Sequence, residues 1–465
     1  MFRTLIGDKT FYKRLFSLMI PIMLQSGITN FVNMLDNIMI GKVGTAPMTG
    51  VAITNQLLFV FNLCIFGVVS GAGIFGAQFF GCGNNEGVQH TFRFKIAVGT
   101  FLTLCAIVLF WLLGTPLLSL YMQGEPTVTD TVSTMQNAKH YLSIMLIGLV
   151  PFAIVQCYSS TLRECGQPTL PLVAGVVAIA VNLLLNYILI FGKLGIPALG
   201  VKGAAIATVI SRFAELVVIV AASHRNAVAL PFMKGVYRSL FIPAKLFVEL
   251  LIKGLPLMLN ETMWAAGLAV VNQCYSVRGL DAVAACNISQ TFWNIFSIAY
   301  MAVGSAASII VGQTLGAGLL KEAKQDGYRL ITFSFLLACA VSVLYAVCAE
   351  FIPLAYNTTN EIRHLATRLM QISALLMPFD ALVHAAYFTV RSGGKMMITA
   401  LFDCGFMWGG NVLLAFLLSY FTQIPFLWLF ACIQGISIIK AVFGILLVRS
   451  GFWVRNIVSS QEGIA

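Results

Sequence analysis

Long apolar runs, each of about twenty residues or more, follow one another along the chain and are separated by short polar segments. A helix rises about 1.5 Å per residue, so about twenty apolar residues are needed to cross the roughly 30 Å hydrocarbon core of a bilayer. The pattern therefore predicts about twelve transmembrane helices. They are expected near residues 15–40, 50–80, 94–114, 138–162, 168–192, 201–223, 246–275, 282–312, 330–352, 365–390, 396–420 and 425–448.

The composition agrees with lipid as the solvent of this protein. Hydrophobic residues make up 59% of the chain and charged residues 10%, which leaves too little polar surface for a soluble domain of this size. Backbone polar groups in lipid must be bonded within the protein, and continuous apolar runs favour helices over the alternating strands of a barrel. The predicted fold class is an all-α integral membrane protein, with the first span a retained helix rather than a signal peptide.

The distribution of basic residues predicts the orientation in the membrane. With the N-terminus inside, about 18 Lys and Arg residues fall in cytoplasmic segments and about 7 in outward segments. Both termini are therefore expected in the cytoplasm. This bias accounts for the net charge of +11 and gives no support to nucleic-acid binding. The eleven cysteines show no metal-ligand or redox spacing and are interpreted as small apolar fillers.

The chain contains an internal repeat. The motif Gln-x-x-Gly-x-Gly begins at Gln78 and again at Gln313, an offset of 235 residues that also relates Pro21 to Pro256. Residues 150–152 and 161–163 match 377–379 and 389–391 at a slightly smaller offset. Two halves of six spans insert with the same orientation and should be related by a pseudo-twofold axis along the membrane normal. The predicted organisation is an N-terminal six-helix lobe at 1–224, a cytoplasmic linker at 225–244 and a C-terminal six-helix lobe at 245–465.

Ionisable side chains inside the spans are the candidate functional residues. A charge at a helix centre costs about 2.5–3.5 kcal/mol on insertion scales, so it needs a function or a partner. Asp36, Asn186 and Thr208 lie six or seven residues from the nearest outer lysine, which puts them at one depth, and Asn182 is one turn deeper than Asn186. One carboxylate with two amides and a hydroxyl is a set of hard oxygen donors suited to a proton or to Na⁺, with Asp36 as the charged ligand.

The second half places its charges near the midplane. Glu261 follows the proline at 256 by five residues, and Asp380 lies about midway between two flanking arginines. His384 is one helical turn beyond Asp380 and could share its proton. Pro21 and Pro256 interrupt helix hydrogen bonding at corresponding positions and are candidate hinges, although either could be an ordinary kink.

Several of these positions together resemble one known family. They are Pro21, Asp36, Gly41, the glycine-rich stretch 71–83, Asn182, Asn186, the segment 203–208, Pro256, Glu261 and the Pro-Phe-Asp of 378–380. The combination is similar to the multidrug and toxic compound extrusion (MATE) transporters, and having both Asp36 and the second-half acids is more like the NorM branch than the DinF branch. The resemblance covers nearly the whole chain.

The resemblance implies a V-shaped arrangement of two six-helix lobes in a bacterial plasma membrane. It also implies that the protein is not an enzyme and needs no cofactor. It implies export of cationic, amphipathic organic molecules in exchange for Na⁺ or H⁺ by a monomer. Asp36, Asn182, Asn186 and Thr208 match the cation site of the N-terminal lobe, and Glu261 with Asp380 matches the acidic pair of the C-terminal lobe. Asn186 stands where some members carry a second Asp, so the coupling ion stays open.

Other classes of membrane protein fit less well. A lipid-linked oligosaccharide flippase of the same general architecture is the main alternative, but its anionic cargo would favour cationic residues at the midplane. A channel needs a continuous pore rather than two lobes. An intramembrane enzyme needs a nucleophile, metal or dyad at chemical spacing, and the sequence contains no H-E-x-x-H, G-x-S-x-G or phosphate-binding loop motif.

Overall fold

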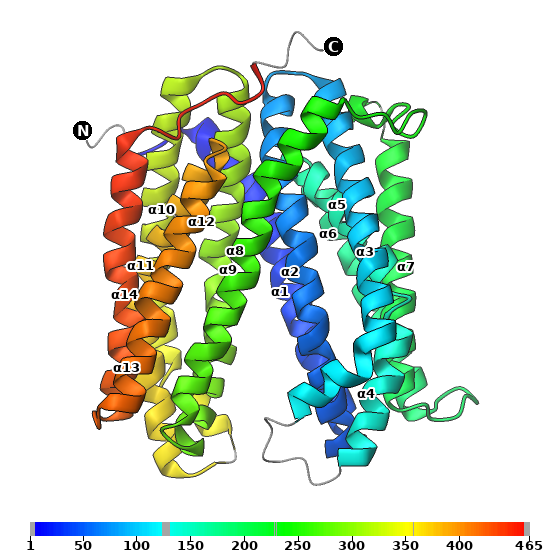
Figure 1. Ribbon diagram of the computed structural model, residues 1–465, viewed down its shortest axis with the longest axis vertical. Coiled ribbons are helices and arrows are strands. Elements are labelled where there is room, and N and C mark those ends of the chain that lie inside the picture. The colour runs from blue at the N-terminus through cyan, green and yellow to red at the C-terminus, as the bar shows by residue number, and fades with distance from the viewer. Residues whose placement is uncertain (1–4, 123–130, 227, 229, 357, 460–465) are drawn as a thin grey trace. The chain divides into compact units, whose positions relative to one another are not determined.

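The regular structure of the protein is helical throughout the residues that the computed structural model describes, which are 5–122, 131–226, 228, 230–356 and 358–459 (Figure 1). The long helices of the first half are α1 (Lys9–Gly41), α2 (Thr45–Gly81), α3 (Asn85–Met122), α4 (Thr131–Met145), α5 (Leu149–Glu164), α6 (Thr169–Phe191) and α7 (Val201–Arg225). Those of the second half are α8 (Ala244–Ser276), α9 (Leu280–Gly316), α10 (Leu320–Cys348), α11 (Asn360–Ser392), α12 (Met396–Phe406), α13 (Leu413–Phe421) and α14 (Phe426–Ser450).

Within the described residues, eleven segments are long and apolar enough to cross a membrane, and the bent pair α4–α5 brings the number to twelve. This confirms the twelve spans expected from the sequence. Most of the observed helices start before and end after their predicted limits, because polar residues at the ends of an apolar run can still continue the helix into the headgroup region.

The fourth span is broken, and the prediction of one continuous helix at 138–162 is wrong in this respect. α4 and α5 meet at an angle of 53° across residues 146–148. Pro151 lacks the N–H that would bond to the carbonyl of Ile147, so the helical ladder cannot run through this point. The Gly148 carbonyl accepts a hydrogen bond of 3.3 Å from the Phe152 N–H and a second one of 3.1 Å from Nη1 of Arg212 on α7.

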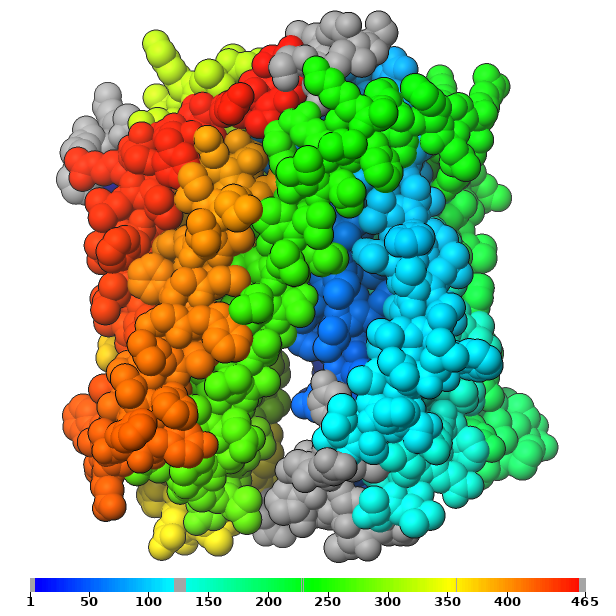
Figure 2. Space-filling model, viewed as in Figure 1, coloured from blue at the N-terminus to red at the C-terminus, as the bar shows by residue number. Residues whose placement is uncertain are grey.

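The eleventh span also departs from a regular α-helix. A π-helical segment, η4 (Met407–Val412), joins α12 to α13. It contains the pair Gly409 and Gly410. The side chain of Asn411 in this segment donates a 3.2 Å hydrogen bond to the Ile433 carbonyl of α14. In Figure 2, α12 and α13, in orange, follow one another along one face, and α14, in darker orange to red, packs beside α13.

The chain forms two compact units. Unit 1 consists of Met1–Met23, Ala77–Asn84 and Leu259–Ala465, and unit 2 consists of Leu24–Gly76 and Asn85–Met258. Each unit has its own apolar core: unit 2 around residues such as Ile65 and Leu149, and unit 1 around residues such as Leu15 and Val303. The units group residues by contact, so the lobe limits 1–224 and 245–465 remain a prediction from the sequence repeat.

The repeated motif forms a close helix crossing inside unit 1. A Cβ on Gly81 would overlap the backbone of Gln313, and a Cβ on Gly316 would overlap the backbone of Gln78. The two contacts are equivalent, because Gln313 and Gly316 lie 235 residues after Gln78 and Gly81 and each glycine touches the glutamine of the other copy. The glycines are therefore required where the ends of α2 and α9 touch backbone to backbone.

Candidate cation and substrate sites

Asp36, Asn182, Asn186 and Thr208, predicted as one oxygen-donor set, lie together in unit 2. The Asn186 amide nitrogen donates to Oδ1 of Asp36 at 2.7 Å and to Oδ1 of Asn182 at 3.1 Å. Nδ2 of Asn182 lies 3.4 Å from Oγ1 of Thr208, which itself donates to the Ala204 carbonyl. Three helices, α1, α6 and α7, thus bring one carboxylate and three neutral polar groups into a continuous hydrogen-bonded row.

One acceptor in this row is left without a donor. Oδ1 of Asn186 is buried and has no hydrogen-bond partner, while the residue as a whole is only 1% exposed. Asn182 is buried as well. A buried carbonyl oxygen beside a carboxylate is a favourable neighbour for a bound cation, because it supplies a second hard ligand that is not already satisfied.

The donor set is suited to a small monovalent cation or a proton rather than to a transition metal. Among the residues that the structure describes, no group of three or more His, Cys, Asp or Glu side chains could hold a metal ion. The carboxylate of Asp36 provides the single charge of the set, and amide and hydroxyl oxygens provide the rest. Such a set balances one positive charge.

Sequence reasoning missed one polar neighbour of this set. Tyr141 on α4 interacts electrostatically with both Asp36 and Arg212, and it is hydrogen-bonded to Asn55 on α2. These residues lie far apart in the sequence and carry no spacing signal. A tyrosine in an apolar run is common in membrane helices, so only the packing of the helices reveals that Tyr141 lies near Asp36.

The second-half candidates lie in unit 1 but do not touch one another directly. Among the described side chains, no hydrogen bond or ion pair joins Glu261 to Asp380. Glu261 interacts electrostatically with Arg391 and Asp403, whereas Asp380 interacts with Ser437 and Lys440. The predicted acidic pair is therefore connected, in this structure, through intermediate charged residues.

Those intermediate residues form a network within unit 1. Nζ of Lys440 lies 2.6 Å from Oδ1 of Asp403, and Nδ2 of Asn260 donates to Oδ2 of the same carboxylate at 3.1 Å. Asn260 also donates to the hydroxyl of Tyr387 at 3.3 Å. The position of Asp403 and Lys440 between Glu261 and Asp380 depends on the packing of α8, α11, α12 and α14.

His384 packs against aromatic rings rather than bonding to Asp380. Its ring centroid lies 4.8 Å from that of Phe388 and 6.0 Å from that of Tyr300. In the described part of the chain no hydrogen bond links His384 to Asp380. The ring of Tyr300 lies near Asp380 as well, since the two groups interact electrostatically.

The two candidate hinge prolines lie where their helices pass from one unit to the other. α1 belongs to unit 1 as far as Met23, two residues after Pro21, and α8 belongs to unit 2 as far as Met258, two residues after Pro256. A proline removes a backbone hydrogen bond, so each helix is weakened beside the point where its packing partners change.

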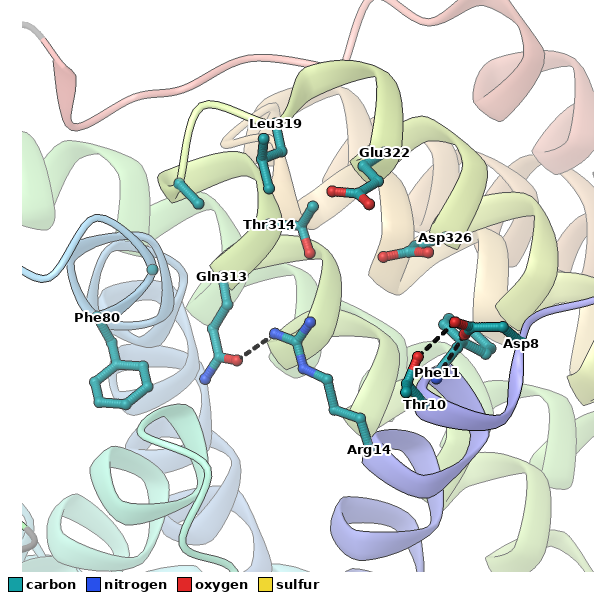
Figure 3. Close-up of a pocket in the computed structure, with 12 residues that line it drawn as sticks. Asp8, Thr10, Phe11, Arg14, Phe80, Gln313, Thr314, Leu319, Glu322 and Asp326 are labelled. Atoms are coloured by element: carbon teal, nitrogen blue, oxygen red, sulfur yellow. Dashed lines mark hydrogen bonds between the residues drawn. The ribbon is translucent and has the colours of Figure 1, made fainter.

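A cavity of about 410 Å³, lined by both charged and apolar side chains, lies within unit 1 at the ends of α1, α2, α9 and α10 (Figure 3). Asp8, Glu322 and Asp326 line it together with Arg14, whose Nη2 donates to Oε1 of Gln313 at 2.6 Å. The Thr10 hydroxyl and the Phe11 N–H donate to Asp8 and hold the pKa of its carboxyl below the ordinary value. These bonds identify Asp8 as the N-cap of α1, and none of the predicted site residues lies in this cavity.

Comparison with known proteins gives consistent results. The MatE family model matches residues 21–188 and 256–404. The chain is 23% identical to the probable multidrug resistance protein NorM of Thermotoga maritima, over 97% of the chain and 95% of the relative. It is 26% identical to the multidrug resistance protein NorM of Aliivibrio fischeri, over 85% and 83%.

Solved structures agree with the fold. A Vibrio cholerae MATE transporter, VcmN, superposes with a TM-score of 0.82 at 19% identity, covering 95% of this chain and 97% of that one. The outward-facing form of a multidrug resistance MATE family transporter also gives a TM-score of 0.82, at 16% identity and with 96% and 97% coverage. At these sequence identities the similarity to the solved structures establishes the fold alone.

Proposed function

The chain belongs to the MatE family, a family of multidrug efflux transporters, and from this premise we propose that it exports amphipathic, mostly cationic organic compounds in exchange for Na⁺ or H⁺. It is a multi-pass membrane protein and a transporter rather than an enzyme, as are its relatives. We further infer that it works as a monomer in a bacterial plasma membrane, with both termini in the cytoplasm and no cofactor.

The observation that carries the proposal is the Asp36 carboxylate with the unpartnered Oδ1 of Asn186 beside it. A carboxylate among neutral groups in a low-dielectric interior is unfavourable, and a bound cation or proton removes the cost. Occupancy of this site therefore changes which packing of α1, α6 and α7 has the lower free energy. That dependence is what an ion-driven conformational cycle requires.

The acids of unit 1 are the proposed substrate-facing charges. Glu261 and Asp380 with the nearby His384 supply negative charge and aromatic surface, which suit a cationic amphipathic compound. The charge of Asp403 is already balanced by Lys440 at 2.6 Å. Pro21 and Pro256 are the proposed hinges, since α1 and α8 change units beside them.

Antiport follows if the cation and the substrate cannot both be held in the same conformation. Binding of the ion stabilises one arrangement of the helices, and binding of the cationic compound stabilises the other. Exchange of one for the other on opposite sides of the membrane then couples the ion gradient to export. The oligosaccharide-flippase alternative is not favoured, because the curated relatives are named as multidrug resistance proteins.

Purified protein in proteoliposomes tests the proposal. Efflux of a fluorescent organic cation is measured with an inward Na⁺ gradient at equal pH, with K⁺ in place of Na⁺, and with a proton gradient alone. We expect Na⁺ to drive efflux, because neutral amide and hydroxyl ligands are superfluous for a bare proton carrier. Efflux driven only by protons would reject the Na⁺ assignment and leave Asp36 as the proton carrier.

Asp36→Asn is expected to abolish gradient-driven efflux while the protein remains folded, because the single exchangeable charge of the site is lost. Asp281→Asn, the same chemical change at an exposed carboxylate in the first turn of α9, is the matched control and should transport as wild type. Wild-type efflux by Asp36→Asn under the same gradient would show that the cation site has been assigned to the wrong residues.

A further inference from the structure

A buried ion pair in unit 2 lies outside every site described so far. Nζ of Lys95 on α3 lies 2.6 Å from Oε2 and 2.7 Å from Oε1 of Glu164, the last residue of α5. Oγ1 of Thr161 and Oγ of Ser160 are 3.1 Å and 3.2 Å from the same nitrogen. Lys95 is 0% exposed and Glu164 is 6% exposed. Four oxygens thus surround one ammonium group in the interior.

The carboxylate of this pair rests on the backbone of α2. A Cβ on Gly73 would overlap Oε1 of Glu164, and a Cβ on Gly76 would overlap Oε2. The two glycines are three residues apart, so they lie on one face of the helix and form a notch that receives the carboxylate. Any larger residue at either position would displace the charged group from its partner.

The notch occupies the last turn of α2 that packs in unit 2. α2 belongs to unit 2 up to Gly76 and to unit 1 from Ala77 onward. α1 and α8 change units beside prolines, but α2 has its proline in the first turn, at Pro47, far from the point where it changes units. Where α2 changes units it has the glycine notch, with the carboxylate of the ion pair packed into it.

Stability alone gives a weak reason for such a pair. Desolvation of two charges offsets most of their attraction, and a well-packed apolar pair is often as stable. What the pair does supply is a fixed geometry, because its hydrogen bonds join α3 to α5 and its carboxylate packs against the α2 backbone at the two glycines. Unlike the ion proposed at Asp36, the ammonium is tethered to the chain and cannot be exchanged.

We propose that Lys95 is a tethered cation that permanently fills a four-oxygen cage, and that the caged pair anchors the Gly73–Gly76 notch of α2 while the rest of the helix moves during transport. Lys95 and Glu164 are positioning residues in this account. The positioning role during transport rests on the proposed function. The binding of the Lys95 ammonium in its cage is independent of that function.

Chemical rescue tests the cage without any transport measurement. Lys95→Ala removes the ammonium and leaves space in which a small alkylammonium ion can bind, entering through lipid as the neutral amine. We expect Lys95→Ala to lower the thermal unfolding midpoint and ethylammonium to restore a large part of the loss. Trimethylammonium, which also enters as a neutral amine but has one N–H donor instead of three, should restore much less. Lys95→Met fills the same space and should not respond to ethylammonium. Equal responses of Lys95→Ala to the two ions would overturn the cage.

Turnover tests the anchor. Gly73→Ala keeps both charges but displaces the carboxylate, and Lys95→Met keeps the glycines but removes the pair. Both should lower the maximal efflux rate per folded molecule by about tenfold, a size typical of conformational coupling, with little change in substrate KM. Gly27→Ala, at a helical glycine with open space around it, is the control.

A purely structural pair would reduce the amount of folded protein and leave the rate per folded molecule unchanged, so that result in both variants would overturn the anchor. Failure of the wild-type protein to transport under any gradient would instead reject the proposed function. The rescue experiment would still report on the cage in that case, and the two failures are therefore distinguishable.

Discussion

The neighbours of a carboxylate decide whether it is available for exchange. Asp36 and Asp403 both lie on predominantly apolar helices, yet Asp403 has Lys440 at 2.6 Å and Asp36 has the neutral amide of Asn186 at 2.7 Å. The charge of Asp403 is compensated within the protein. The charge of Asp36 has no ion-pair partner among the described side chains, so compensation has to come from a bound ion or a proton.

Glu261 and Asp380 should be coupled through the charges between them. A double-mutant cycle on substrate affinity with Glu261→Gln and Asp380→Asn is expected to give a coupling energy of about 0.5–1 kcal/mol, because the network of Asp403 and Lys440 links the two acids. The control cycle pairs Asp380→Asn with Asp281→Asn, which should be additive. Additivity in the first cycle as well would separate the two acids into independent groups.

At the scale of the helices, glycine and proline mark the points where packing changes. Pro21 and Pro256 occur in α1 and α8 just before each helix changes units. α2 and α9 instead meet through Gly81 and Gly316, where each helix touches the backbone of the other. Proline lowers the local resistance to bending, and glycine permits an approach that no other residue allows.

The crossing should therefore be intolerant of a single added methyl group. Gly81→Ala or Gly316→Ala is expected to destabilise the protein by about 1–3 kcal/mol, the usual cost of overpacking a close contact. Unfolding in detergent with increasing denaturant measures the loss, with Gly27→Ala as the control. Similar effects from Gly81→Ala and Gly316→Ala are expected from their equivalent contacts, and a wild-type midpoint for either variant would contradict the close approach.

At the scale of the whole molecule, the membrane sets both composition and orientation. Apolar side chains such as Trp111, Leu112 and Phe443 are more than half exposed, which is consistent with contact to lipid acyl chains. The net charge of +11 follows from basic residues concentrated in the segments predicted to lie in the cytoplasm.

The orientation can be checked with reporter fusions at the C-terminus. A fluorescent protein that matures only in the cytoplasm should be bright there, and alkaline phosphatase, which is active only outside, should be inactive. The same phosphatase fused after Gly195, in the segment between α6 and α7 that is predicted to face outward, is the positive control. Active phosphatase at the C-terminus would reverse the predicted topology.

The sequence by itself determined the fold class, the number of spans and the repeat. These depend on periodic or cumulative properties, namely the length of apolar runs, the balance of charge and the recurrence of a motif, which packing does not alter. The predicted depths of Asp36, Asn182, Asn186 and Thr208 placed four residues on three helices at compatible heights, because helical rise is nearly constant.

Only the tertiary structure decided which helices stand beside one another and how each is rotated. For that reason it alone showed Tyr141 near Asp36, the charges between Glu261 and Asp380, and the aromatic surroundings of His384. The cage around Lys95 has the same origin, since Lys95, the surrounding oxygens and the two glycines come from three different helices. Residue spacing fixes the height of a side chain along its own helix, whereas its partners depend on the rotation and packing of neighbouring helices.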